Sequence, residues 1–570
     1  MLFQPSPSLF AQVDTGAILG TVKDQSGAVI PGAKVSLTNE GTGLTLTNTS
    51  DSSGNYTFTP IKIGSYSVTA QYQGFQTMER RNVQVQVQQQ VQVNFTLAPG
   101  QVTQTVEVNA APPALQVLNA SVGQVVTSRQ INNLPLNGRN YTFLAQLAAG
   151  VTQDQEDTRG LGASGSFAAN GLRPAQNNYL LDGIDDNADL VDFLNGTAYV
   201  VRPPVDAIAE FKIQTDDYSA EMGRSAGAVL NASVKSGTNR FHGDAWEFLR
   251  NDAFDASNFF ENSGGLTKGE YRQNQFGATL GGPIRKDKTF FFVDYEGTRI
   301  RQATPFTETV PTDLERSSLF TNLSDLIKFQ QGAAPQTDVL GRNFALGQVL
   351  DPATTRAVSC GVPDPVTGLV AACPSGTAVG TPIGYVRDPF PGNIIPSNRL
   401  DPNAVKLLNL FPAPTAPGLV NNFSSNPVAR TTVNQFDVRG DQNFSDKDQM
   451  FARFSYSDVP QFLPGPFPGF ADGGSFSDGD QTAVSINAAL SETHSFSGTM
   501  VNEARLGFTR IGTTRLQPFA TETNNVPGQF GIGGVPQVPL NGGLPSIFFQ
   551  GLSTLGSNEF LPSAEYNSTI

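Results

Sequence analysis

From about residue 240 onward, the chain alternates apolar and polar residues in segments that are separated by turns of two very different lengths. Met450 and Phe454 fall on one face of such a segment, whereas Arg453 and Ser455 fall on the other. Because successive side chains of a strand point to opposite sides, this pattern predicts strands with one apolar and one polar face. A soluble β-sandwich would show the same period, so alternation alone does not separate a sandwich from a membrane barrel.

The turn lengths separate these two architectures. Short turns lie at 282–288, 444–448 and 495–498, and long segments lie at 252–271, 299–431 and 458–481. Short turns on one side and long loops on the other are typical of outer-membrane β-barrels. The sequence has no run of 18 apolar residues, so a membrane-spanning chain of this kind has to use a closed barrel. We predict strands near 240–251, 272–281, 289–298, 432–443, 449–457, 482–493 and 500–510.

Aromatic residues gather near the ends of the predicted strands. Phe290, Phe291 and Phe292 are consecutive, and Trp246 lies two residues before Phe248. Barrel strands place aromatic rings at both membrane interfaces. We therefore expect these two groups to belong to the aromatic girdles.

The composition excludes several classes of function. The chain has 36 basic and 50 acidic residues and a net charge of -14, which argues against nucleic-acid binding. Its two histidines, His242 and His494, lie far apart, and no G-x-S-x-G motif occurs. Residues 160–165 match G-x-G-x-x-G, but no predicted strand precedes them and no helix follows, so they form a loop. We expect no enzyme activity, no cofactor and no metal site.

Residues 13–98 show short strands with Gly/Asp turns at the spacing of a small β-sandwich. The segments 20–27, 30–33, 54–58 and 64–68 resemble the carboxypeptidase regulatory-like (transthyretin-like) domain. The resemblance implies a spacer or docking module without catalytic residues. Similar folds occur in starch-binding modules, so carbohydrate binding is the alternative. Residues 1–12 are predicted to be the remnant of a signal peptide.

Residues 99–115 form a linker with one β-prone stretch between Pro-rich flanks. Such a stretch can pair with the sheet edge of a partner, because β-augmentation relies on main-chain hydrogen bonds. It resembles the "TonB box" of outer-membrane transporters, through which an energising protein pulls. The alternatives are the last strand of the first domain or an inert linker. The candidate residues are Gln104, Thr105, Val106, Glu107 and Val108.

Residues 116–238 resemble the plug domain of TonB-dependent outer-membrane transporters of the Oar-like branch. Two pieces carry most of the resemblance, 134–140 and 181–184, and 220–224 and 236–243 follow in the expected order. The resemblance implies a mixed α/β plug inside a barrel. The motif residues are Leu134, Pro135, Leu136, Asn137, Gly138, Arg139, Asn140, Asp182, Gly183, Glu221 and Arg224.

The charged residues of this unit allow more than one interpretation. Asp182, Asp185 and Asp186 suggest a cation site, but they lack the spacing of a calcium loop, and turn-forming carboxylates are the better interpretation. We expect a second set to brace the plug against a polar lumen rather than contact substrate. Its members are Arg139, Glu210, Glu221 and Arg224.

The segment 299–431 is too long for an ordinary loop and indicates a functional one. Its only two cysteines, Cys360 and Cys373, are predicted to form a disulfide if the compartment is oxidising. Asp401 followed by Pro402 predicts a short helix through Leu408, because an aspartate N-cap and a proline at the first position favour a helix start.

The expected protein is mainly β: an N-terminal β-sandwich, a mixed α/β plug, and part of an antiparallel transmembrane β-barrel over 239–570. Transporters with such a plug close about 22 strands, and the sequence predicts about eight, so we expect the N-terminal part of a longer barrel. The resemblance implies energy-coupled uptake of an unidentified external ligand through the outer membrane. The implied partners are a TonB-type energising protein of the inner membrane, outer-membrane lipid and the barrel-assembly machinery, with the first domain in the periplasm. The alternative is a surface adhesin or carbohydrate-binding protein without transport.

Overall fold

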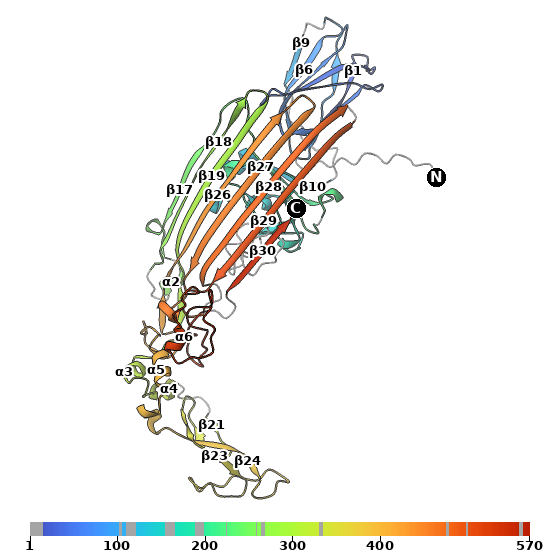
Figure 1. Ribbon diagram of the computed structural model, residues 1–570. Helices are drawn as coiled ribbons and strands as arrows, with labels where there is room; N and C mark the ends of the chain where they lie inside the picture. The colour runs from blue at the N-terminus through green and yellow to red at the C-terminus, as the bar shows by residue number, and fades with distance from the viewer. Residues whose placement is uncertain are drawn as a thin grey trace.

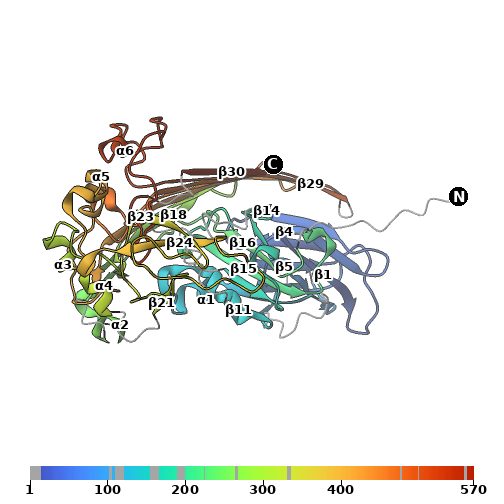
Figure 2. The same cartoon turned by 90° about the horizontal axis from the view of Figure 1, so that it is seen from below.

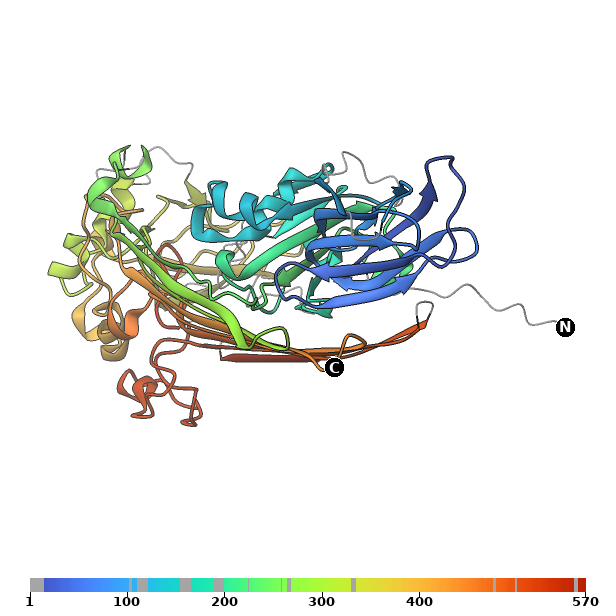
Figure 3. The same ribbon diagram turned by 90° about the horizontal axis from the view of Figure 1, so that it is seen from above.

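The computed structural model describes residues 15–101, 105–109, 121–153, 166–188, 199–223, 225–257, 259–263, 268–329, 335–474, 478–497, 500–557 and 562–569. A large tilted sheet spans the middle of the molecule, with the first domain at one end and a long folded loop at the other (Figure 1). The plug lies against the concave face of this sheet, as the views from below and from above show (Figure 2 and Figure 3).

The first domain is a sandwich of two sheets, as expected. Ile18, Leu37 and Phe95 are fully buried between them and belong to one apolar core. Gly20 lies where an added Cβ would fall 1.9 Å from the carbonyl oxygen of Val93, so close packing of the two segments requires glycine there. One sheet contains β1 (Thr15–Asp24), β4 (Asn55–Lys62), β7 (Gln90–Gln92) and β8 (Phe95–Leu97), and the other contains β2 (Lys34–Asn39), β3 (Thr45–Thr49), β5 (Gly64–Gln71), β6 (Thr77–Val85) and β9 (Thr105–Asn109).

The plug is built on a five-stranded sheet in the order β10-β15-β16-β13-β14. Two short helices belong to the plug, α1 (Ser128–Asn133) and the 3-10 helix η2 (Tyr141–Leu147). Phe211, Ile208 and Leu181 are fully buried in the plug core. The strands are β10 (Val122–Thr127), β13 (Asn178–Leu181), β14 (Ile184–Asp185), β15 (Ile208–Asp216) and β16 (Val229–Val234).

The large sheet confirms the predicted partial barrel. Its eight described strands are antiparallel and pair in the order β17-β18-β19-β26-β27-β28-β29-β30, so that β17 and β30 are its two edges. All seven predicted strands are present, and most are longer than predicted. They are β17 (Ala245–Asn251), β18 (Tyr271–Arg285), β19 (Thr289–Ala303), β26 (Val428–Asn443), β27 (Asp448–Leu463), β28 (Gly479–Ser497), β29 (Met500–Leu516) and, in addition, β30 (Ser563–Thr569).

The two faces of the large sheet differ in polarity. On β26, Asp437, Arg439 and Asp441 are buried against the plug, whereas Val438 between them is 45% exposed on the outer face. Arg453 on β27 is buried on the same inner face. An apolar outside and a polar inside are typical of a transmembrane barrel wall. Short turns lie at the end nearest the first domain, and long loops lie at the other end (Figure 1).

The prediction of aromatic girdles is wrong for four of its five residues. Phe290 and Phe292 are buried on the inner face, and Phe292 joins the apolar core of the plug. Trp246 and Phe248 lie against a plug arginine instead of facing lipid. In a barrel that contains a plug, bulky rings on the inner face fill the space between the wall and the plug. A barrel with an open lumen has no such space to fill.

The long loop, 304–427, folds into an arm that extends away from the sheet (Figure 1). A hairpin forms its outer part, from β23 (Leu350–Ser359) and β24 (Pro382–Pro389), and Cys360 and Cys373 form a disulfide at its tip. The predicted short helix is α5 (Pro402–Leu408), with Asp401 as its N-cap. Of the helices in the described ranges, none has the length and apolarity needed to cross a membrane.

Candidate functional site

A tight turn of the plug reaches the barrel wall between β13 and β14. Asp182 and Gly183 occupy its two central positions with φ values of 49° and 75°. Left-handed backbone at both positions is the geometry of a two-residue hairpin turn, which Asp-Gly favours. Asp182 is therefore a turn residue, as expected, but its side chain also has a second task.

The Asp182 carboxylate is fully buried and receives hydrogen bonds from both the plug and the wall. Its Oδ1 accepts from the Val234 backbone N–H at 3.0 Å and from Arg439 Nη1 at 3.0 Å. Its Oδ2 accepts from Arg453 Nε at 2.7 Å. A third wall arginine, Arg505, donates to the Asp182 carbonyl oxygen at 3.2 Å. Arginines from β26, β27 and β29 thus converge on one turn of the plug.

Neighbouring wall residues hold these guanidinium groups in place. Arg439 donates to both oxygens of Asp441, at 3.1 and 3.3 Å, and this forked pairing orients its plane. Arg453 donates to Asn487 Oδ1 at 2.7 Å and also to Ser455 Oγ. The donors are therefore oriented before the plug aspartate meets them, and we name Asp182, Arg439, Arg453 and Arg505 the anchor cluster.

A second contact between plug and wall involves Arg139 of the 134–140 segment. Its guanidinium pairs with Asp206 of the plug and lies 3.7 Å from Glu296 Oε2 of β19. It also stacks against the wall, with 5.2 Å to the Trp246 ring and 4.4 Å to the Phe248 ring. Arg139 therefore contacts both the plug and the barrel wall.

The rest of the 134–140 segment shapes the plug around Arg139. Gly138 has a φ of 73°, which permits the bend of the short 3-10 helix η1 (Asn137–Arg139). Asn140 is buried and caps η2 by accepting the Thr142 backbone N–H at 3.0 Å. Leu134 is partly exposed, and Leu136 packs on the plug core. The segment thus combines a cap, a bend and a bridging arginine.

Glu210 does not brace the plug against the lumen, which corrects the expectation for this residue. It lies on β15 and accepts a hydrogen bond from the Val87 backbone N–H of the first domain. Burial raises the pKa of Glu210 to about 7, against the opposing effects of Val87 and Lys212. Burial lowers the pKa of Lys212 to about 8, and Glu210 opposes that shift. This pair lies at the boundary between first domain and plug.

Other predicted site residues are placed only in part. The Glu221 side chain, Arg224 and Gln104 lie outside the described residues. Thr105–Asn109 forms β9, an edge strand parallel to β6 of the first domain. This placement corresponds to the alternative in which the stretch is the last strand of that domain.

A chamber of about 490 Å³ lies on the side of the plug that faces the long loops. Glutamines of the wall line it, including Gln275, Gln435 and Gln461, together with hydroxyl groups such as Thr298. Gln275 and Gln435 each donate to Glu296 Oε1 at 3.0 Å. Such amide and hydroxyl groups can form hydrogen bonds, and they lie beside apolar lining residues such as Val433 and Ile511.

The described part of the chain brings three possible cation ligands together. Asp448, Glu492 and His494 offer atoms within 4.8 Å of one another on β27 and β28. Asp448 already pairs with His494 and accepts from Ser445 Oγ at 2.7 Å. Their strand positions place them on the outer face near a short turn, away from the plug. We assign no metal to this group.

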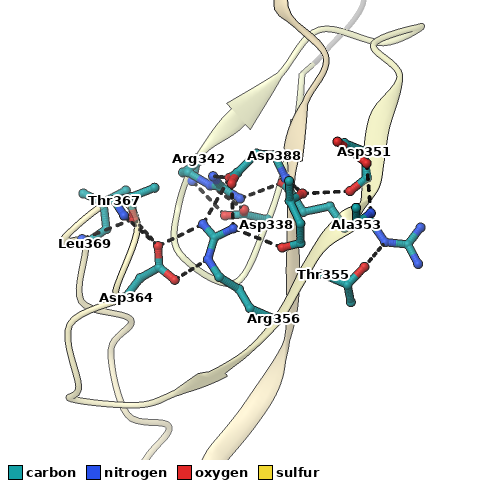
Figure 4. A network of polar contacts seen from close by, with 12 residues as sticks. Asp338, Arg342, Asp351, Ala353, Thr355, Arg356, Asp364, Thr367, Leu369 and Asp388 are labelled. Atoms are coloured by element: carbon teal, nitrogen blue, oxygen red, sulfur yellow. Dashed lines mark hydrogen bonds and ion pairs between the residues drawn. The ribbon is translucent and has the colours of Figure 1, made fainter. Parts of the chain in front are cut away.

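The arm carries a dense network of charges (Figure 4). Arg356 donates to Asp364 at 2.6 and 2.9 Å and to Asp388 at 2.7 and 3.0 Å. Arg342 joins Asp338 at 2.8 Å and Asp388 at 2.5 Å. The Arg356 guanidinium holds the pKa of Asp364 well below its usual range. These pairs stabilise the arm as a folded unit, which its length alone did not predict.

Sequence reasoning missed the wall half of the anchor cluster. The alternation places Arg453 on the polar face of its strand, but nothing in a single strand indicates which plug residue it meets. The available signal is the presence of charged residues at inward positions of several strands. Buried charges require partners, so inward arginines on β26, β27 and β29 imply an acidic partner inside the lumen.

Comparisons with known proteins agree with this architecture. The family described as "Outer membrane beta barrel domain" matches residues 233–570, and the family described as "Carboxypeptidase regulatory-like domain" matches residues 17–98. The TonB-dependent transporter Oar of Myxococcus xanthus is 30% identical over 332 residues, which covers 52% of this chain and 30% of that protein.

Two solved structures are among those to which the chain shows a distant likeness. The siderophore receptor PirA from Acinetobacter baumannii is 14% identical with a TM-score of 0.38, over 71% of this chain and 42% of that chain. The outer membrane transporter YddB from Escherichia coli is 12% identical with a TM-score of 0.39, over 70% of this chain and 40% of that chain. The chain thus spans less than half the length of these relatives. By its family match over 233–570, the chain belongs to the outer-membrane β-barrel family, and it is an outer-membrane protein related to the TonB-dependent transporter Oar.

Proposed function

We propose that this chain forms part of a TonB-dependent transporter, which takes up a polar ligand through a plugged β-barrel of the outer membrane. The anchor cluster is the observation that carries this proposal. A plug has to stay in place at rest and move when energy is supplied. A single aspartate shared by arginines of three wall strands provides a strong contact that a small movement of one turn breaks.

The chamber above the plug is the proposed ligand site. It lies on the side of the long loops, and the wall glutamines and hydroxyl groups among its lining residues can hydrogen-bond the polar groups of a ligand, while apolar residues such as Val433 and Ile511 complete the lining. No catalytic step is proposed, since the relatives are named as transporters and receptors. The ligand itself is not assigned by this lining.

The proposed energy source is a TonB-type protein of the inner membrane that pulls on the chain near residues 104–108. Because β9 is an edge strand, it can leave β6 and pair with another sheet edge without disturbing the sandwich core. The first domain would then lie in the periplasm, at the end with the short turns. Outer-membrane lipid and the barrel-assembly machinery are the further partners that a barrel of this type needs.

Site-specific photo-crosslinking tests the energising partner. A photoreactive residue at Val106 should crosslink to an inner-membrane-anchored protein in energised cells, whereas the same residue at Thr45 on the opposite edge strand β3 should not. Crosslinks confined to the chain itself would reject this part of the proposal.

The folded arm favours one alternative, a surface-binding protein without transport. Its charge network and disulfide keep a large module folded far from the sheet (Figure 4). An adhesin would bind its target equally well with and without a proton gradient. Ligand accumulation that disappears when a protonophore is added would exclude this alternative.

A further inference from the structure

The first domain contacts the plug, the barrel wall and the segment between them. The Val87 N–H donates to Glu210 of the plug, and the Asn239 N–H donates to the Gly41 carbonyl oxygen at 2.9 Å. Lys62, on β4, pairs with Asp441 of the wall at 2.9 Å. The domain is therefore docked at the short-turn end of the barrel rather than suspended from a free linker.

The Lys62 contact continues directly into the anchor cluster. Asp441 Oδ1 accepts from Lys62 Nζ, and both Asp441 oxygens accept from Arg439. Arg439 in turn donates through Nη1 to Asp182 and to the Val234 carbonyl oxygen, each at 3.0 Å. Charges alternate in sign along this path, from the first domain through the wall to the plug.

We propose that docking of the first domain strengthens the hold of the barrel on its plug, through the chain of contacts Lys62–Asp441–Arg439–Asp182. This proposal goes beyond transport itself, and it rests on the proposed role of Asp182 as plug anchor. The first domain is then a part of the gate rather than a spacer.

The direction of the effect follows from how Arg439 divides its hydrogen bonds. With Lys62 in place, Asp441 has two cations, and the forked pair aims the third nitrogen of Arg439 at Asp182. Without Lys62, Asp441 has Arg439 as its remaining cation in this chain of contacts and attracts it more strongly. Arg439 then shares less of its charge with Asp182, and the plug is held less tightly.

Burial makes the path effective. The side chains of Asp441 and Asp182 are 2% and 0% exposed, and that of Arg439 is 7% exposed, so water screens these charges little. Lys62 is 32% exposed and is the member that solvent reaches. The solvent-accessible end of the path, Lys62, thus lies on the first domain, which is the part that can undock.

Two backbone amides report separately on docking and anchoring. The Val87 amide donates across the docking surface, and the Val234 amide donates to Asp182. Hydrogen exchange of the full protein in detergent should show that Lys62→Met speeds exchange at Val234 about tenfold, the scale of one charge-assisted hydrogen bond. Lys62→Arg should restore the slow rate, and the matched control Lys34→Met, an exposed lysine on β2, should leave it unchanged.

Coupling between two sites is reciprocal, so the reverse experiment gives a second test. Asp182→Asn should speed exchange at the Val87 amide, although the hydrogen bonds of the Asp182 carboxylate described above all go to the plug and the wall. Faster exchange at Val87 but not at Val234 in Lys62→Met would overturn the proposal, and so would unchanged exchange at both.

Failure of this inference is distinguishable from failure of the proposed function. If Asp182→Asn leaves the outer membrane impermeable while Lys62→Met still speeds exchange at Val234, coupling stands and the anchoring role in transport fails. If Asp182→Asn opens the pore while Lys62→Met changes nothing at Val234, the transport proposal stands and the coupling fails.

Discussion

Replacing Asp182 by asparagine removes one charge from the anchor cluster and turns one of the two acceptor oxygens of the side chain into an NH2 donor. The asparagine side chain retains an oxygen that accepts the Val234 N–H, and Arg439 retains its forked pair with Asp441. Arg453, which is 2% exposed, loses its only charged hydrogen-bond partner among the described residues; its remaining hydrogen bonds go to neutral groups such as Asn487, and Asp186 and Asp437 act on it only through space. A buried charge left without its counterion costs about 3–5 kcal/mol.

That cost falls on the state with the plug in place, because a displaced plug leaves the arginines open to water. At about 1.4 kcal/mol per tenfold change, the displaced state becomes roughly 10² to 10⁴ times more populated. The assay is the entry rate of a chromogenic β-lactam, hydrolysed in the periplasm, into cells that make the protein. Asp216→Asn, an exposed carboxylate of the same plug, is the matched control.

We expect entry to rise strongly for Asp182→Asn and to stay at the wild-type rate for Asp216→Asn. Equal rates for Asp182→Asn and wild type, with equal amounts of protein in the outer membrane, would refute the reasoning. The cause would then be that the plug is held mainly by its packing against the inner face.

Three further predictions concern other regions. Glu210 has a pKa of about 7 in the folded protein, above its usual 4.5, so its contribution to the free energy of unfolding is present below pH 4.5 and is lost as pH rises to about 7. In wild type, the free energy of unfolding in urea should therefore be lower at pH 8 than at pH 5, by up to about 3 kcal/mol. Glu210→Gln should remove this difference between the two pH values. Arg356→Met should expose the arm to limited proteolysis at neutral pH, while wild type should resist until pH falls well below the usual aspartate range, because Arg356 lowers the pKa of Asp364. Cys373→Ser should speed proteolysis at the arm tip without raising β-lactam entry, since closing this loop contributes about 3 kcal/mol and the disulfide lies far from the plug. Identical cleavage in wild type and either arm variant, or a pH-independent difference for Glu210→Gln, would count against these explanations.

The barrel strands were predictable because each carries its own evidence. Strict alternation over 449–457 and 482–493 identifies a strand and its two faces without reference to any neighbour. β30 was missed because Ser563–Thr569 contains one aromatic residue and no regular apolar period. The girdle prediction is wrong for Phe292 and Trp246 for a related reason: a strand shows which residues share a face, but not whether the lumen is filled.

The site was predictable on one side only. The Asp182-Gly183 turn follows from local turn preferences, and the negative charge of Asp182 indicates that it needs a cationic partner if it is buried. Which arginines meet Asp182 depends on the register of strands that lie far away in the sequence. Arg439, for example, is 257 positions from Asp182. Lys62 and Asp441 are 379 positions apart, and no local pattern relates a lysine of a small sandwich to a distant barrel strand.

The central claim is that energy moves the plug, and thiol labelling in living cells tests it most directly. Ser233 is a small, 3% exposed plug residue beside the cavity at the short-turn end, and the cysteines of the described chain are paired, so Ser233→Cys introduces a single reactive thiol. We predict that the cysteine introduced at position 233 is labelled faster in energised cells suspended in medium that contains the ligand than in the same cells treated with a protonophore. Equal labelling rates in the two conditions would contradict an energy-driven plug.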